Sequence, residues 1–73
     1  MNLKKEVLVR FGNRVREIRT EIGISQEQLA FEADLHRTHI GMIERAEKNI
    51  TLVNIEKLAK AFGITISELM NTI

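Results

Sequence analysis

Apolar residues recur at helical spacing along most of this chain. Between residues 3 and 22 they return every three or four positions, which predicts a long amphipathic helix that ends at Gly23. A similar pattern predicts a helix that begins after Thr51, as N-cap, and stops at Gly63. The predicted inward-facing residues of these two helices are Leu8, Phe11, Val15, Ile18, Ile22, Leu52, Ile55, Leu58, Ala59 and Phe62.

The segment from Ser25 to Arg45 predicts two short helices joined by a tight turn. Ser25 and Gln28 have the spacing of a capping box, in which each side chain bonds to the backbone N–H of the other. The apolar pattern breaks at Asp34, a residue type that tolerates the left-handed conformation, and then resumes. The chain must therefore reverse around residues 33–36. The predicted inward residues are Leu29, Ala30, Ala33, Ile40 and Ile43.

Two helices joined in this way have one well-known use, which is to carry the second helix into the major groove of DNA. Periodicity alone fits equally well with two helices of an arbitrary small bundle. The distinction depends on the residues that the second helix leaves at or near its outer surface. These residues are Arg37, Thr38, Gly41, Met42 and Arg45.

The C-terminal end predicts a further short helix and a contact with a second copy of the chain. Thr65 and Glu68 form a second capping box, which opens that helix. The end is rich in apolar residues, and a small domain cannot hide all of them internally. We therefore predict a symmetric homodimer through the last helix and the end of the helix before it. The predicted interface residues are Ile66, Leu69, Met70 and Ile73.

Length and composition restrict the class of protein. With 73 residues we expect one domain, 1–73, which buries only about 60% of its unfolded surface. The chain has no Cys, no apolar run long enough to span a membrane and no recognisable signal peptide, so we expect a cytoplasmic location. We find no phosphate loop, zinc motif or paired nucleophile and base, so we predict no enzyme activity and no cofactor. The expected fold class is all-α with five helices.

The net charge of +1 conceals a segregation of charge along the chain. Residues 1–20 carry six basic and two acidic side chains, a balance of +4, whereas residues 21–35 carry four acidic side chains and no basic one, a balance of −4. Binding to phosphate depends on the charge of one face rather than on the sum. The pattern favours a basic surface for nucleic acid, although an ordinary solvated surface gives a similar pattern.

His36 and His39 lie three residues apart, which is a spacing that metal ligands use. No third ligand of a suitable type is near them in the sequence, and there is no Cys. We therefore predict no metal site. For His39 we expect a hydrogen bond to backbone or to a DNA phosphate instead.

The run IRTEIGISQEQLAFEADLHRTHIGMIER resembles the core of the lambda-repressor-like, XRE-type helix-turn-helix family of DNA-binding proteins. The stretch LHRTHIGMIERAEKNITL is similar to a narrower group, the controller proteins of restriction–modification systems. The chain departs from that group with His39 for Tyr, Gly41 for Ser and Lys48 before Asn49. The resemblance covers nearly the whole chain and implies a five-helix DNA-binding fold. It also implies an Arg19–Glu44 pair, which an Arg fork and a carboxylate can form in bidentate fashion.

The DNA contacts can be predicted from residue chemistry. Arg37 opens the second helix, where its planar fork can reach O6 and N7 of guanine, and Thr38 can contact a base, a thymine methyl or a phosphate. Met42 offers an apolar contact, and Gly41 permits close approach. Free N–H groups at a helix N-terminus favour phosphate. The predicted base-reading residues are Arg37, Thr38, Gly41 and Met42, and the predicted backbone contacts are Ser25, Gln26, His39, Lys48, Asn49, Arg14 and Arg45.

Two classes of function follow from these residues. The first is a homodimeric transcription regulator that binds a two-fold double-stranded DNA operator, as a restriction–modification controller or a phage-type repressor. The second is a protein-interaction module of the same fold, such as an antitoxin domain or a coactivator. An acidic surface at Glu27 and Glu32 is a candidate contact for RNA polymerase. The basic start of the second helix favours the first class.

Overall fold

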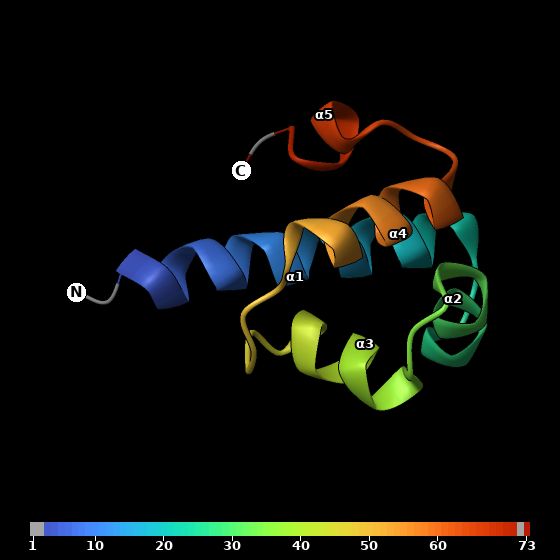
Figure 1. The fold of residues 1–73 in the computed structure, drawn as a ribbon, viewed down its shortest axis with the longest axis horizontal. Coiled ribbons are helices and arrows are strands. Elements are labelled where there is room, and N and C mark those ends of the chain that lie inside the picture. The colour runs from blue at the N-terminus through green and yellow to red at the C-terminus, as the bar shows by residue number, and fades with distance from the viewer. Residues whose placement is uncertain (1–2, 72) are drawn as a thin grey trace.

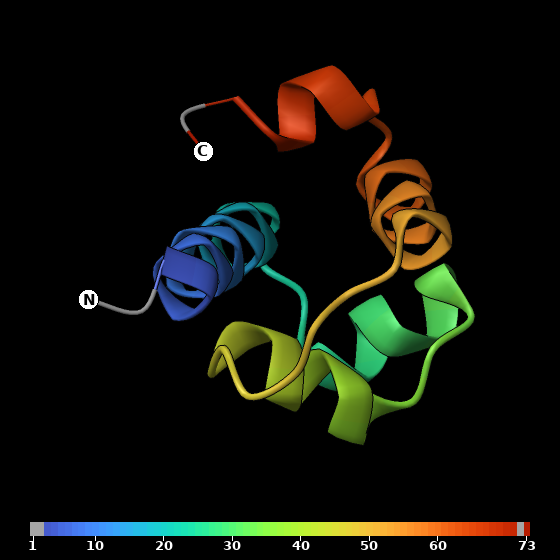
Figure 2. The same cartoon turned by 60° about the vertical axis from the view of Figure 1, so that its left-hand side comes forward.

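The computed structural model describes residues 3–71 and 73, and in that part of the chain it contains five helices. Their bounds are α1 Leu3–Ile22, α2 Gln26–Ala33, α3 Arg37–Glu44, α4 Leu52–Phe62 and α5 Ile66–Leu69. The long helix α1 runs through the middle, with α2 and α3 on one side of it and α5 on the other (Figure 1). Seen nearly along α1, the helices surround a shared interior (Figure 2). The predicted all-α fold is confirmed.

Side-chain caps fix where two of the short helices begin. At α5 the capping box is complete, because Glu68 N donates to Thr65 Oγ1 at 3.0 Å and Thr65 N donates to Glu68 Oε1 at 3.0 Å. At α2 only half of the predicted box is present, with Gln28 N donating to Ser25 Oγ at 3.0 Å. The Gln28 amide instead donates to Glu32 Oε1 one turn further on, at 3.0 Å. The predicted box needs the Gln28 side-chain oxygen to accept from the Ser25 backbone N–H, whereas the observed hydrogen bond directs the amide along the helix to a carboxylate at i+4.

The turn between α2 and α3 contains the left-handed residue that was predicted. Asp34 has φ 56° and ψ 48°, and the N–H of Leu35 returns to the carbonyl of Ala30 at 2.9 Å. A second left-handed residue, Ala46 with φ 58°, follows α3 and was not predicted. Gly23 and Gly63 end α1 and α4 as expected. The two left-handed residues, Asp34 and Ala46, change the direction of the chain before and after α3.

The core receives one fully buried side chain from each helix. The most deeply buried large residues are Val15, Leu29, Ile40, Leu58 and Leu69. Two residues predicted to face inward are exposed instead, Ile22 at 51% and Leu52 at 70%. Each stands at the very end of its helix. Leu69 was predicted as an interface residue, but its side chain belongs to the core of its own chain and is unavailable to a partner.

Gly12 lets α1 and α3 approach each other closely. A Cβ atom added there would lie 2.5 Å from the carbonyl oxygen of Ile43 and 2.9 Å from that of Glu44, both of which belong to the α3 backbone. Real Cβ atoms do not come so close to backbone oxygens, so this crossing requires glycine. The absence of a side chain at Gly12 therefore fixes the depth at which α3 sits against α1.

The Arg14 side chain ties α5 to α1. Its Nε donates to the carbonyl of Leu69 at 3.2 Å, its Nη2 donates to the carbonyl of Glu68 at 3.0 Å, and its Nη1 meets Glu17 Oε1 at 3.2 Å. These carbonyls lie at the C-terminal end of α5, and that of Glu68 also accepts from Asn71 N at 3.3 Å. The Arg14 guanidinium is thus engaged within the chain, and the predicted contact with the DNA backbone requires it to leave these partners.

Across residues 3–71 and 73, no helix combines the length and the apolar character that a membrane span needs. In the same part of the chain, no three His, Cys, Asp or Glu residues come together in a way that would hold a metal ion.

Candidate nucleic-acid interface

The short helix α3 has one buried face and one exposed face. Ile40, Ile43 and Glu44 are buried against the other helices, whereas Arg37 and Thr38 are exposed at its start. Met42 is half-buried at the edge between the two faces. Such a helix can offer its first turn to an external ligand while its other face remains packed.

The buried end of α3 is held by the Glu44 carboxylate, whose side chain is 0% exposed. Arg19 donates to it twice, from Nε to Oε2 at 2.7 Å and from Nη2 to Oε1 at 3.1 Å. The ion pair that the family resemblance implies is thus present and bidentate. Gln26 also donates to Oε1 at 3.0 Å, and Arg16 Nε lies 3.5 Å from the same oxygen. Sequence reasoning missed these two partners, because nothing local marks a residue of α1 or α2 as a neighbour of α3.

Three neighbouring side chains keep the Glu44 carboxylate ionised. Burial alone would raise the pKa of the Glu44 carboxyl, but hydrogen bonds from Arg19, Gln26 and Arg16 outweigh that effect, so the pKa lies below its ordinary value. The same hydrogen bond raises the pKa of Arg19. A buried pair of this kind fixes the angle between α1 and α3, and its contribution to stability comes second.

One N–H of the Gln26 side-chain amide is therefore committed to Glu44, which leaves its second N–H for the predicted phosphate contact. Its amide nitrogen is bound to Glu44, and the residue is only partly exposed at the start of α2. Ser25 remains exposed, but its hydroxyl already accepts from Gln28 N. At the α2 N-terminus, Gln26 thus helps to position α3, whereas Ser25 is exposed.

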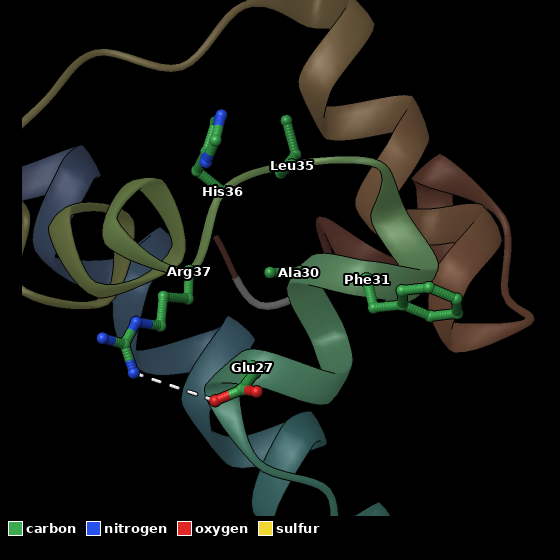
Figure 3. Close-up of a pocket in the computed structure, with 6 residues that line it drawn as sticks. All are labelled: Glu27, Ala30, Phe31, Leu35, His36 and Arg37. Atoms are coloured by element: carbon green, nitrogen blue, oxygen red, sulfur yellow. Dashed lines mark ion pairs between the residues drawn. The ribbon is translucent and has the colours of Figure 1, made fainter.

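Arg37 extends from the start of α3 and meets Glu27 of α2. The two side chains point toward one another (Figure 3), with Arg37 Nη1 at 3.7 Å from Glu27 Oε2. Arg37 is 74% exposed in this contact, so the pair is well solvated and weak. Arg37 can leave Glu27 for a ligand at little cost.

The middle of α3 differs from the prediction. Gly41 is buried, not open to close approach, because the Arg45 guanidinium covers it. The Nε of Arg45 also lies 3.1 Å from Glu47 Oε2. A shallow hollow joins this region to the start of the helix, and it is lined by Gln26, Arg37, Thr38, Gly41 and Arg45.

His39 turns inward instead of toward a phosphate. Its Nε2 atom is buried and has no hydrogen-bond partner in the part of the chain that the structure describes. Burial lowers the pKa of His39, and the positive charges of Lys48 and His36 lower it further. The ring is therefore neutral at pH 7 and adds no charge to the interface. The predicted hydrogen bond from His39 is not found among the described residues.

Lys48 and Asn49 are exposed in the segment between α3 and α4, where they were predicted to clamp the DNA backbone. Asn49 borders an apolar hollow whose other lining residues include Phe11, Ile50 and Met70. Neither residue lines the hollow at Arg37, so both can meet a different part of a long ligand.

Among the described residues, the most exposed large apolar side chain was not singled out from the sequence. Phe31 of α2 is 82% exposed and points away from α3 (Figure 3). It lies off the apolar stripe of its helix, which is the only sequence signal that could have marked it. Exposed acidic residues surround it in the sequence, at Glu27, Glu32 and Asp34.

Comparison with known proteins identifies the family. The model of the Helix-turn-helix family matches residues 15–69. The control protein C.BamHI of Bacillus amyloliquefaciens is 52% identical over 62 residues, which span 84% of this chain and 76% of that protein. The control protein C.MunI of a Mycoplasma species is 42% identical over 69 residues, 93% of each chain. The chain therefore belongs to the helix-turn-helix family and, within it, to the group that contains these control proteins.

A solved structure gives the same result. The crystal structure of the restriction-modification controller protein C.AhdI from Aeromonas hydrophila matches with a TM-score of 0.87 at 50% identity. The match covers 90% of this chain and 96% of that one.

Proposed function

We propose that this chain is a sequence-specific DNA-binding transcription regulator, and that it controls restriction–modification genes as its relatives' names indicate. The observation that carries the proposal is the division of α3 into a locked face and a free one. Glu44 and the core hold the helix in place, while Arg37 and Thr38 stand exposed at its first turn. A helix-turn-helix protein reads the major groove with the N-terminal residues of such a helix. We also propose a cytoplasmic location and no catalytic role.

The proposed contacts divide into two kinds. Arg37 and Thr38 read base edges, with Met42 at the margin of the same surface. Lys48, Asn49 and the exposed start of α2 at Ser25 meet phosphates. Gln26 supports these contacts indirectly through Glu44.

Replacement of Arg37 by alanine should weaken binding to the preferred operator by about 1–3 kcal/mol and relax preference at one base pair in each half-site. Replacement of Lys48 by alanine should instead weaken all sequences alike and flatten the salt dependence by about one unit of slope. The measurement is a binding titration against specific and scrambled DNA at two salt concentrations.

Lys60→Ala is the matched control for this experiment, because it removes the same charge from the exposed side of α4, where Lys60 pairs with Glu56 at 3.8 Å. It should change neither preference nor salt slope. Full discrimination by Arg37→Ala would mean that Arg37 reads no base, and the protein-interaction function would then gain support.

We further propose a symmetric homodimer that uses α5 and the end of α4. Ile66, Met70 and Ile73 are only partly buried and remain available, although Leu69 is not. Two-fold proteins match operators whose half-sites lie about 10 base pairs apart or a multiple of that. Sedimentation equilibrium should show a dimer at tens of micromolar, and Met70→Glu should shift it toward monomer. A monomer alone for the unsubstituted chain would refute this arrangement.

An acidic surface on α2 is the proposed contact for RNA polymerase. The exposed side chain of Phe31 next to Glu32 favours a protein partner at this surface. Glu32 is the better residue to test, because Glu27 already meets Arg37 and its loss would also disturb DNA reading. Glu32→Lys should lower transcriptional activation and leave operator affinity unchanged. A parallel loss of both activities would argue against a separate activating surface.

A further inference from the structure

Gly41 lies inside α3, and packing against the other helices does not require a glycine there. A Cβ atom added there would meet only the guanidinium of Arg45, at 2.9 Å from Nη1 and 3.5 Å from Cζ and Nη2. Gly12 is different, because a Cβ atom there would meet the backbone of another helix. Glycine is one of the least favourable residues inside a helix. Neither the core nor helix formation accounts for Gly41, so what the glycine provides is room for Arg45.

The Arg45 side chain is held in that room from two sides. Arg45 caps the C-terminus of α3, and its side chain reaches back one turn to lie against Gly41. Its Nε lies 3.1 Å from Glu47 Oε2, and half of the side chain is exposed. A carboxylate at Nε orients the planar fork and leaves the two terminal nitrogens for another acceptor.

The surface on which the guanidinium lies is the same one that contains the proposed base-reading residues. Arg45, Arg37 and Thr38 line one hollow. An acceptor that fits two adjacent nitrogens of a fixed, planar fork presents two oxygens or nitrogens side by side. In the major groove, O6 and N7 of guanine form such a pair.

We propose that Arg45 is a second base-reading arginine, which recognises a guanine in each half-site, and that Gly41 is the surface that positions it. This inference rests on the proposed function. It replaces the phosphate contact that the sequence predicts for Arg45. Gly41 is then a positioning residue that acts through Arg45 and touches no base itself.

The test is selection of bound sequences from random double-stranded DNA, followed by titration of the best operator. Arg45→Ala should lower affinity for that operator by about tenfold or more, since one bidentate base contact is worth that much. It should lose preference at one base pair per half-site, different from the base pair that Arg37→Ala affects. Gly41→Ser keeps Arg45 but fills the space in which its guanidinium lies, so it should relax the base preference at the same base pair as Arg45→Ala.

A double-substitution cycle separates this role from a general disturbance of α3. In the Arg45→Ala background, Gly41→Ser should have no further effect on base preference. Circular dichroism should show that Gly41→Ser remains helical. Arg45→Lys should not restore preference, because an ammonium group lacks the planar fork.

Three results would overturn the inference. In the first, Arg45→Ala retains the full base preference. In the second, Arg45→Ala binds all sequences equally more weakly and with a flatter salt dependence. In the third, Arg45→Lys has the base preference of the unsubstituted chain. Each of these outcomes assigns Arg45 to a phosphate or to no contact. Selection by the unsubstituted chain shows which proposal has failed. If it enriches no sequence, the proposed function itself fails, whereas enrichment with an unaffected Arg45→Ala variant overturns only the role of Arg45.

Discussion

Replacement of Arg19 by methionine should lower the free energy of unfolding by about 3 kcal/mol, because it leaves a buried carboxylate without its main partner. Arg19 supplies two hydrogen bonds to Glu44, at 2.7 and 3.1 Å, and the Glu44 side chain is 0% exposed. Methionine keeps the apolar stem, so the change isolates the charge. Urea denaturation at pH 7 measures the loss.

Arg10→Met is the matched control, since Arg10 lies on the same helix and pairs with Glu6 at 3.0 Å in an exposed site. That pair should be worth less than about 1 kcal/mol. Addition of Glu44→Met to Arg19→Met should recover stability, because it removes the uncompensated buried charge. Equal losses in Arg19→Met and Arg10→Met would contradict the role of the buried pair.

The same pair makes stability depend on pH in a definite direction. The pKa of Glu44 is lower in the folded chain than in the unfolded one. Its stabilising contribution is therefore fully present above the unfolded pKa and is lost as the pH falls through the folded value. In Arg19→Met the folded pKa of Glu44 should rise, so this variant should lose less further stability on acidification than the unsubstituted chain.

Replacement of Gly12 by alanine should destabilise the fold by about 2 kcal/mol or more, although alanine normally stabilises a helix. The added methyl would lie 2.5 Å from the carbonyl oxygen of Ile43 and 2.9 Å from that of Glu44. Backbone atoms of a packed helix cannot move aside as a flexible side chain can, so α3 must shift away from α1. A thermal melt followed by circular dichroism measures the effect.

Gly41→Ala makes the same chemical change in a different setting and is the natural comparison. Its methyl would meet only the Arg45 side chain, which can swing out. We expect this variant to match the unsubstituted chain or to gain up to about 1 kcal/mol from helix propensity. If the two alanine variants had the same Tm, the close approach at Gly12 would not be a constraint on the fold.

The helices were predictable because their signals are local. Periodicity, N-cap residues and terminal glycines act within one or two turns, and the capping box at Thr65 has both of its hydrogen bonds. The bidentate pair between Arg19 and Glu44 was anticipated only through the family resemblance. Residue chemistry can show that such a pair is possible, but it cannot show which arginine of α1 faces α3.

What the sequence did not reveal depends on contacts between distant segments. Arg14 looks like a free cation until α5 places two carbonyls beside it, 54 and 55 residues further along the chain. Gln26 was predicted as a phosphate ligand, and only the packed structure shows that its side-chain amide donates to Glu44. Gly12 looks like an ordinary glycine in a helix, because only the packed structure shows the backbone that crosses it.

The division of α3 into a packed face and an exposed face lets the DNA target of such a protein change without a loss of folding. Glu44 and Gly12 hold the helix through contacts on its buried side alone. Substitutions at Arg37 and Thr38 remove no core contact, so selection for a new target sequence meets little opposition from selection for folding. Among natural variants, positions 37 and 38 should drift with the DNA target while positions 12, 19 and 44 stay fixed.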